Sequence, residues 1–473
     1  MHKFLEDAAR AVRDAEEDWI PGNLQPFINQ SATDVNFRTE YGEDLLTWEL
    51  ILQFLDQSGI EPTQKPPRAA RFVNGVLLIA RALVSTEKGA QLAWESNVGP
   101  RVVDLVKCLL GVDARTDRQE RLLSTCFQFL ANSSNHRAVG PELMQGLNDG
   151  QLANLGRELA SNNQLYLLVI VASTVKRDAS FVLNSGRPAF IHILSQVEVW
   201  HSTDKDDSIR VANDIFKSLI PIGSQLLESF KDVTRDQHLS MLKMLDAALS
   251  VSEVGDSRVP LAAVLIDELE KASSSAQPFI TQFDMNPEYS QAIKLEIASI
   301  WNSLVIILDS LILLLEKSPQ GALLTLDQRP KAIEVIVNFL VLAERNLPKK
   351  SKLSQIDSNA EYDPQEFPLI KGKLITLVSV FTHFIPHSVQ DEVRRLHGLE
   401  VILSNCMIDQ NNPYIREQSI VALRYLLEEN AANQEFVSKL EAKENVTEDA
   451  LHEVGYETEI INGKVTLKKR PKT

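Results

Sequence analysis

The sequence has few of the residues that build disulfide frameworks or metal centres. Among 473 residues there are three cysteines, Cys108, Cys126 and Cys406, which lie far apart and without CxxC spacing. Such cysteines are typical of reduced core residues in a cytoplasmic protein, and no disulfide scaffold is expected. The six methionines are scattered, so no methionine-rich copper motif is present.

Aromatic residues are also scarce. They make up 6% of the chain, whereas leucine, isoleucine, valine and alanine supply most of a hydrophobic share of 44%. This composition suits a core of stacked helices. The chain carries 48 basic and 64 acidic residues, a net charge of −16, which argues against a surface that wraps nucleic acid or an anionic membrane.

Long uninterrupted apolar runs are missing as well. The first residues, MHKFLEDAARAVRDAEEDW, are charged throughout and lack the apolar stretch of a signal peptide, so we expect no secretion. The most hydrophobic region, residues 300–315, is interrupted by Asn302, Ser303, Asp309 and Ser310. Because a membrane span needs about 20 nearly uninterrupted apolar residues, we expect no membrane insertion.

Motifs that carry chemistry are absent from the sequence. There is no Walker loop, no GxSxG turn, no HExxH and no paired zinc-ligand spacing. His383 and His387 are four residues apart, but Pro386 lies between them and no ligand-rich segment accompanies them, which favours solvent or core histidines over a metal site. Cys406 lies in an apolar row without a basic neighbour, which favours a core residue over a nucleophile. We therefore predict no enzyme, and no catalytic, cofactor-binding or metal-binding residues.

What the sequence does contain is helical periodicity, clearest in residues 397–440. A first helix places five apolar residues on one face, namely Leu399, Ile402, Leu403, Cys406 and Met407. Asn412 and Pro413 then predict a helix start, because asparagine can cap free N–H groups and proline has none. The next helix is apolar almost all round, with one row at Ile415, Ser419, Ala422 and Leu426 and another at Ile420, Leu423 and Leu427. Such a helix is expected to lie between neighbours.

The same pattern recurs along the chain. Glycine is followed closely by proline at Gly99, Gly140 and Gly186, spaced 41 and 46 residues apart, and Gly398 has the same place before residues 399–440. Armadillo and HEAT repeats have periods of about 40 to 47 residues. We interpret each glycine as the left-handed end of one helix before the next begins. Unrelated amphipathic hairpins are the less favoured interpretation.

These patterns predict an all-α fold, an armadillo- or HEAT-like right-handed superhelical solenoid with a short C-terminal β-hairpin at Asn462 and Gly463. We expect turns at residues 21–39, a loop at residues 272–288 and a core helix with an apolar stripe from Ile297 to Leu315. The predicted divisions are a helical cap at 1–60, repeats at 61–344, a polar loop or linker at 345–366, C-terminal repeats at 367–443 and a tail with the hairpin at 444–473.

Three weaker signals complete the pattern. An importin-like groove would need tryptophan and asparagine ladders, but the corresponding positions hold Val421 and Tyr425, so such a groove is disfavoured. The basic run KKRPK, from Lys468 to Lys472, favours a solvated tail over a nuclear-import signal. Ser318, before a proline, is a phosphorylation site or a helix-ending turn.

Three segments, FPLIKGKLITLVSVFTHF, HGLEVILSNCMIDQNNPYIREQSIVALRYLLEENAANQEFV and VGYETEIINGKVTLKK, together resemble the C-terminal domain of the ataxin-10 family. The likeness is closest at CMIDQNNPYIREQSIVALRYLLEENAANQ, with its D-x-N-P turn and its ending in N-Q, and it covers about the last hundred residues. Residues 382–391, THFIPHSVQD, depart from the family pattern, so we expect a distorted short helix there.

The resemblance implies an armadillo-like scaffold without catalysis, cytoplasmic, linked to cytokinesis, cell division and cell survival, and prone to self-association. Protein partners and a homo-oligomer are therefore expected. From the residues themselves we predict a partner-binding site at the exposed polar turn of Asn411, Asn412, Arg416 and Glu417, with a helix cap and a solvated charge pair as the alternative. The competing function is an adaptor or enzyme regulator with a metal at His383 and His387, linked to copper because some fungal relatives carry a copper-transport name.

Overall fold

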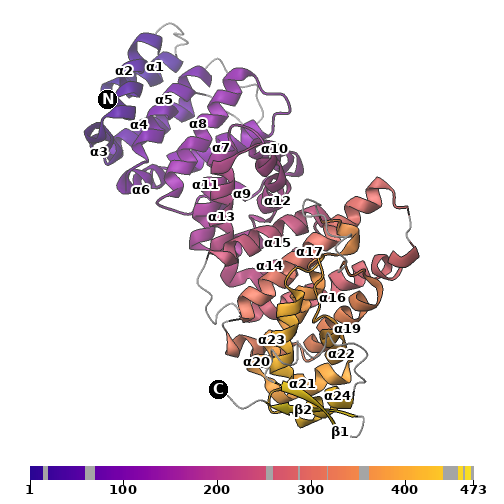
Figure 1. The fold of residues 1–473 in the computed structure, drawn as a ribbon. Coiled ribbons are helices and arrows are strands. Elements are labelled where there is room, and N and C mark those ends of the chain that lie inside the picture. The colour runs from indigo at the N-terminus through magenta and orange to yellow at the C-terminus, as the bar shows by residue number, and fades with distance from the viewer. Residues whose placement is uncertain are drawn as a thin grey trace. The chain divides into compact units, whose positions relative to one another are not determined.

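The computed structural model describes residues 1–13, 20–58, 70–251, 259–285, 288–316, 318–350, 362–439, 456–461 and 464–469. The chain divides into two compact units, unit 1 (Met1–Ile222) and unit 2 (Gly223–Thr473). Both are built of helices packed on helices (Figure 1). The division falls inside the predicted repeat segment 61–344, and the predicted domain limits stay predictions. Residues 61–69 and 351–361, from the predicted breaker and linker, lie outside the described residues.

Unit 1 has two rows of helices. In the first row each helix packs on the next, and the members are α2 (Ile20–Thr33), α5 (Ala70–Leu83), α8 (Asp117–Ser134), α11 (Gln164–Arg177) and α13 (Asp206–Leu219). The second row is formed in the same way by α1 (His2–Arg13), α4 (Leu45–Gln57), α7 (Val98–Leu110), α10 (Asp149–Leu159) and α12 (Arg187–Ser202). Three short helices belong to neither row and lie between row members in the sequence, namely α3 (Val35–Gly42), α6 (Glu87–Glu95) and α9 (Gly140–Met144). Each helix thus buries its apolar stripe against members of both rows.

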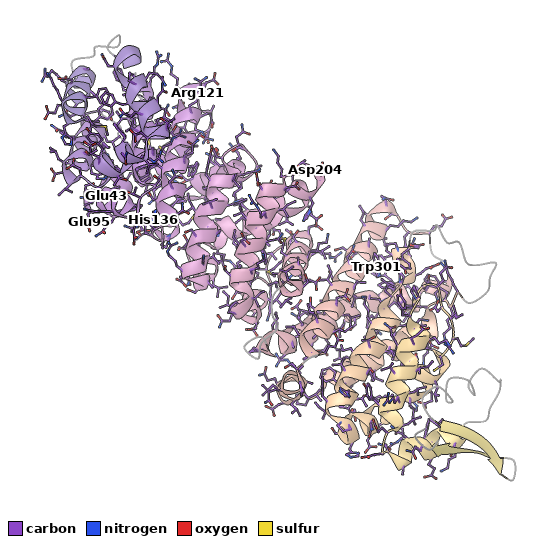
Figure 2. The ribbon with its side chains drawn as sticks, turned by 60° about the vertical axis from the view of Figure 1, so that its left-hand side comes forward. Glu43, Glu95, Arg121, His136, Asp204 and Trp301 are labelled. Atoms are coloured by element: carbon purple, nitrogen blue, oxygen red, sulfur yellow. The ribbon has the colours of Figure 1, made fainter. Side chains whose placement is uncertain are left out.

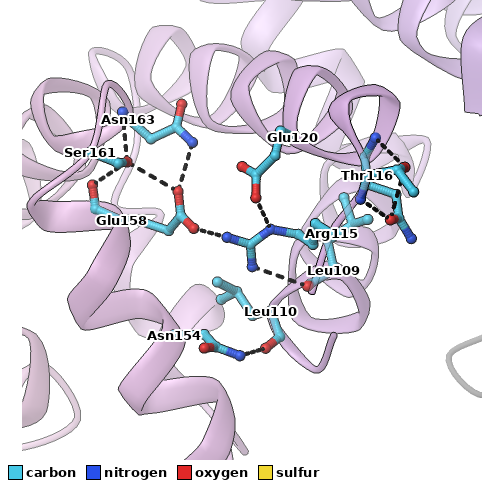
Figure 3. A network of polar contacts seen from close by, with 10 residues as sticks. Leu109, Leu110, Arg115, Thr116, Glu120, Asn154, Glu158, Ser161 and Asn163 are labelled. Atoms are coloured by element: carbon cyan, nitrogen blue, oxygen red, sulfur yellow. Dashed lines mark hydrogen bonds and ion pairs between the residues drawn. The ribbon is translucent and has the colours of Figure 1, made fainter. Parts of the chain in front are cut away.

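A buried charge network locks neighbouring layers of unit 1 together (Figure 3). Arg115, in the loop between α7 and α8, forms an ion pair with Glu158 of α10, and the two side chains are 9% and 3% exposed. Arg115 also donates to Glu120 Oε1 at 2.7 Å, and Asn163 Nδ2 donates to Glu158 Oε2 at 2.8 Å. Both charges are therefore paired and hydrogen-bonded, which is the condition under which buried charges are tolerated.

The repeating glycines stand at helix starts, but for a different reason from the one predicted. Gly99, Gly140 and Gly398 lie in the first turn of α7, α9 and α22 (Gly398–Ser404), and none of them has a positive φ. The left-handed residues are instead Asn97 and His397, one or two positions earlier. A Cβ at Gly99 would overlap the ring of Trp94, and one at Gly140 would lie 2.7 Å from Thr174 Oγ1. Close packing, rather than a left-handed turn, requires these glycines.

Unit 2 repeats the two-row arrangement. One row contains α15 (Arg235–Ser250), α17 (Gln291–Leu315), α20 (Ile370–Phe384) and α23 (Ile415–Leu427), and the other contains α16 (Val259–Thr281), α19 (Ala332–Asn346) and α22. The remaining helices are α14 (Gly223–Ser229), α18 (Pro319–Gln328), α21 (Pro386–Arg395) and α24 (Ala431–Lys439). The fold of both units is all-α, with one two-stranded ribbon near the C-terminus.

That ribbon consists of β1 (Tyr456–Ile461) and β2 (Lys464–Lys469). The strands pair antiparallel with Tyr456 opposite Lys469 and Ile461 opposite Lys464, and β2 lies beside α24. The predicted turn residues Asn462 and Gly463 lie outside the described residues, as do residues 470–472 of the basic run.

Helix α17 is the longest in unit 2, and its predicted stripe is confirmed. Six stripe residues are buried, namely Ile297, Ile300, Leu304, Leu308, Leu311 and Leu315, while Trp301 and Ile312 are half-buried. By length and composition α17 is able to cross a membrane. In unit 2 it packs against α15, α16 and α20, as a core helix does.

Three local predictions are wrong. Residues 21–39, predicted as turns, form most of α2 and α3, because Phe27 and Phe37 pack in an aromatic cluster with Phe4 and Tyr41. Residues 272–281, predicted as loop, continue α16, where Ala276 and Ile280 are fully buried one turn apart. The short helix expected to be distorted is the regular ten-residue α21. In each case packing overrides the helix-breaking signal of proline, glycine or serine.

Candidate functional site

The predicted partner-binding residues lie on the turn between α22 and α23 and on the first turn of α23. Asn411 and Asn412 are only 5% and 3% exposed, whereas Arg416 is half-buried and Glu417 is exposed. The prediction that this turn presents its amide side chains to solvent is therefore wrong for both asparagines. The Asn412 side chain and the Asn411 backbone carbonyl are used inside unit 2, while Asn411 Nδ2 is buried without a hydrogen-bond partner.

Asn412 belongs to a cap, but on a helix other than the one predicted. Its Oδ1 accepts a hydrogen bond from the Gly372 backbone N–H at 3.2 Å, and the Asn411 carbonyl accepts one from the Leu369 N–H at 2.7 Å. Leu369 precedes α20 in a left-handed conformation and supplies no side-chain cap. The turn therefore satisfies the N–H groups that the start of α20 leaves free. Helix α23 itself begins at Ile415, with no side-chain cap from Tyr414.

Beneath the turn lies a buried lysine between two carboxylates. Lys371 is 1% exposed, and its Nζ lies 3.6 Å from Glu344 Oε2 and 3.5 Å from Asp409 Oδ2. Burial lowers the pKa of Lys371, and the charges of Glu344 and Asp409 oppose that shift. Asp409 also accepts from the backbone N–H groups of Lys350 and Asn411, both at 3.1 Å.

Glu344, at the end of α19, is held by several donors. Lys349 Nζ lies 2.5 Å from its Oε1, Ser404 Oγ donates at 2.6 Å, and Asn405 Nδ2 donates to Oε2 at 3.0 Å. Burial alone would raise the pKa of Glu344, but the hydrogen bonds from Lys349 and Ser404 outweigh burial and hold the pKa below its ordinary value. The cluster thus joins α19, α20 and the α22–α23 turn. Because Lys371 is closed to solvent, it serves this junction and not a substrate.

The other end of α23 is capped by side chains from two neighbouring elements. Gln390 of α21 is fully buried and donates through Nε2 to the carbonyls of Tyr425 and Glu428, at 2.7 and 2.8 Å. Asn433 donates to the Leu426 carbonyl at 2.7 Å, and Gln434 to the Leu427 carbonyl at 2.8 Å. The carbonyls left free at the helix end are thereby satisfied. The last turn of α23 is thus fixed by Gln390, which lies 35 residues before Tyr425, and by Asn433 and Gln434 of the next helix, α24.

What the turn does expose is apolar. Ile408 is 65% exposed, Tyr414 is 73% exposed, and Val421, two helical turns after Tyr414 on the same face, is 47% exposed. We call these three residues, with Glu417 between the last two, the Tyr414 surface. The predicted site contained only polar residues, so this apolar surface was not predicted. The available signal was that Ile408 and Tyr414 lie outside the apolar rows predicted for the two helices.

His383 and His387, the metal site of the competing function, are not part of a ligand cluster among the described residues. His383 ends α20 and stacks on Tyr425 with ring centroids 4.7 Å apart, while His387 lies on α21. Within the described ranges, no three His, Cys, Asp or Glu side chains gather in a way that could hold a metal ion. Cys406 is 3% exposed and Cys126 is fully buried, whereas Cys108 is half-buried. Burial raises the pKa of both the Cys126 and the Cys108 thiols, which disfavours the reactive thiolate.

Comparison with known proteins places the capped turn and its helices in one family domain. Residues 370–468 match the "Spinocerebellar ataxia type 10 protein domain". The chain is 41% identical to the "Ataxin-10 homolog" of Debaryomyces hansenii over 138 residues, which are 29% of this chain and 28% of that protein. It is 48% identical to the "Ataxin-10 homolog" of Kluyveromyces lactis over 110 residues, 23% of this chain and 20% of that protein. With "Ataxin-10" of Xenopus tropicalis the identity is 37% over 79 residues, 17% and 16% of the two chains. The chain therefore spans less than a third of the length of these relatives.

Proposed function

Because the chain belongs to the ataxin-10 family through residues 370–468, we propose that it is a non-catalytic protein-interaction scaffold of armadillo-like helical repeats. Its place of action is the cytoplasm, in cytokinesis, cell division and cell survival, as the family resemblance implies. Its partners are proteins, a second copy of the chain included, and it neither binds nucleic acid nor inserts into a membrane.

The observation that carries this proposal is the Tyr414 surface. Tyr414 stands 73% exposed beside a turn whose buried atoms are tied to α20 by hydrogen bonds from Leu369 and Gly372. An exposed aromatic residue on a rigid support loses little conformational freedom when a partner covers it. Exposed tyrosines of this kind often supply much of the binding energy of protein interfaces.

The architecture of both units supports the scaffold part of the proposal. In each unit every second or third helix packs on the next member of its own row, as in proteins built of stacked helical repeats. The buried side chains of Lys371 and Gln390 hold helices together, Lys371 through ion pairs with Glu344 and Asp409 and Gln390 through hydrogen bonds to two carbonyls of α23 and its end. No observation favours the metal-linked alternative, and we do not propose it.

The test is proximity labelling in cells with the tagged full chain, comparing three versions. The first is the unchanged chain, the second carries Ile408→Ser and Tyr414→Ser, and the third carries Leu323→Ser as a matched control, since Leu323 on α18 is 48% exposed. We expect the double variant to lose a defined set of labelled proteins that the control retains. Identical sets for all three chains would refute a scaffold role for the Tyr414 surface.

A further inference from the structure

Unit 1 contains a groove whose charge is opposite to that of the protein. The groove has a volume of about 790 Å³ and lies over the end of α8 and along α11 and α13. Its rims carry Lys176, Arg177 and Lys217, with Asp214 as the one acidic side chain among its lining residues. A local excess of two positive charges in a chain of net charge −16 identifies this surface as unusual for the molecule.

The cations of the groove are largely uncompensated by carboxylates. In the described part of the chain, Lys176 has no ion-pair partner. Lys217 forms an ion pair with the exposed Asp214, with 3.4 Å between Lys217 Nζ and Asp214 Oδ1. Arg177 donates only to neutral oxygens, including the carbonyls of Ser134 at 3.0 Å and Asn135 at 2.7 Å. The guanidinium is thereby fixed against the carboxyl end of α8, and its charge stays available at the groove.

The floor of the groove is small and apolar. It is formed by Val169 and Ala172 of α11 and Val211 of α13, all half-buried. Short side chains of this kind allow a polypeptide backbone to approach closely, while the rim cations meet its side chains.

The neighbouring face of α8 extends this polar, non-acidic character. Arg121, in the second turn of α8, and His136, in the turn that follows α8, are both exposed (Figure 2). Between them the residues at helical spacing on that face include Gln128, Asn132 and Asn135, without a carboxylate. An anionic segment that leaves the groove along α8 therefore meets no repulsive charge on this stripe.

From this geometry we propose that the groove binds an extended acidic segment of a partner protein. Three adjacent helices whose axes lie about 8–10 Å apart span roughly 16–20 Å, which five or six extended residues cover at about 3.3 Å each. Carboxylates on alternate residues reach the rims at Lys176, Arg177 and Lys217, and the intervening side chains lie on the valine and alanine floor.

A protein segment fits this surface better than a nucleic acid. Duplex DNA carries one phosphate charge per about 1.7 Å, and a strong anionic field of that kind is opposed by the net charge of −16 of the chain. The two or three carboxylates of a short peptide interact mainly with the cations of the groove, because salt at physiological ionic strength screens interactions between exposed charges beyond about 8 Å. The groove lies in unit 1 and the Tyr414 surface in unit 2. A negative result for peptide binding at the groove therefore does not contradict the role proposed for the Tyr414 surface, and the reverse also holds.

The experiment uses the purified full chain and three fluorescent probes. The first probe is a pool of eight-residue peptides with Glu at every second position, the second is the same pool with Gln in place of Glu, and the third is a mixed eight-nucleotide single strand. The groove variant carries Lys176→Ala and Lys217→Ala, and the matched control carries Arg157→Ala and Lys205→Ala, which removes two exposed cations elsewhere in unit 1. Arg177 is kept, because its truncation would also remove bonds that hold α8 to α11.

We expect fluorescence polarisation to show binding of the Glu pool, at least tenfold weaker binding of the Gln pool, and weakening of the Glu pool with salt. The groove variant should lose at least tenfold in affinity for the Glu pool, while the control stays within twofold of the unchanged chain. Equal affinity of both variants, equal affinity for the Glu and Gln pools, no binding of the Glu pool, or tighter binding of the nucleotide strand would each overturn the proposal.

Discussion

The side chain of Asn412 accepts a hydrogen bond from the backbone N–H of Gly372, which stands 40 residues earlier in the chain. Through this bond the turn before α23 completes the start of α20. The same asparagine donates through Nδ2 to Asp409 Oδ2 at 2.9 Å, so one side chain connects the helix start to the carboxylate that faces Lys371. The stability of the family domain should depend strongly on it.

Replacing Asn412 by alanine should destabilise unit 2 by about 2–3 kcal/mol, because it leaves the buried Gly372 N–H without its acceptor and removes a donor from Asp409. The measurement is urea unfolding, with hydrogen exchange of peptides from residues 370–439 to assign the transition to unit 2. Glu417→Ala, at an exposed position of the same segment, is the control and should change stability by less than about 0.5 kcal/mol. Equal stability of the two variants would show that the cap is dispensable.

Glu344→Gln should flatten the acid dependence of stability. The folded-state pKa of Glu344 lies below its ordinary value of 4.5, so the folded chain binds this proton less readily than the unfolded chain. Its ionised form therefore stabilises the fold above that ordinary value, and this stabilisation is lost as pH falls through the lowered folded-state pKa. The difference in unfolding free energy between the unchanged chain and the variant should shrink from about pH 6 to about pH 3. A constant difference over that range would contradict the role assigned to Lys349 and Ser404.

Gln390→Ala should loosen the last turn of α23. Two carbonyls, those of Tyr425 and Glu428, lose their buried donor, at a cost of about 2 kcal/mol or more. Hydrogen exchange should accelerate in peptides from residues 421–434 and change little in unit 1. Gln434→Ala, which removes one donor at a half-buried position, should produce a smaller acceleration. Equal acceleration in the two variants would argue against the special position of Gln390.

Two glycines of unit 1 should respond in opposite ways to alanine. At Gly99 a Cβ would overlap the ring of Trp94, so Gly99→Ala should destabilise unit 1 by about 1–3 kcal/mol. At Gly150, in α10, the nearest atom is Asn148 Oδ1 at 3.4 Å, and the helical preference of alanine should leave stability unchanged or raise it by up to about 1 kcal/mol. Thermal unfolding of both variants checks this, and a destabilised Gly150→Ala variant would contradict it.

Periodicity allowed the helices with one broad apolar stripe to be predicted. The stripe of α17 from Ile297 to Leu315 and the row of α23 at Ile415, Ser419, Ala422 and Leu426 are buried as expected, because burial of one face depends on residues within the helix itself. The starts and ends of helices were predicted less well. Whether Asn412 caps its own helix or α20 depends on a segment 40 residues away, which no local pattern contains.

The candidate site, too, could not be predicted fully from local sequence patterns. A polar turn is usually exposed, so Asn411 and Asn412 were predicted at the surface, but the buried charges of Lys371 and Asp409 require polar partners inside unit 2. Tyr414 was overlooked for the complementary reason, since an aromatic residue next to a helix is usually part of the core. Which side chains of a turn face inward is decided by the neighbouring helices, and the sequence of the turn does not record it.

The long separation between Gly372 and Asn412 also affects the order of events during protein synthesis. When the residues of α20 are added to the growing chain, the asparagine that completes the first turn of α20 is still to be added. At about 5–20 residues per second, the 40 intervening residues take roughly 2–8 seconds to translate. The last turn of α23 is completed only after Asn433 and Gln434 have been added, because their side chains donate to its carbonyls. The hydrogen bonds that complete the start of α20 and the end of α23 therefore form only after the segments that supply their partners have been synthesised.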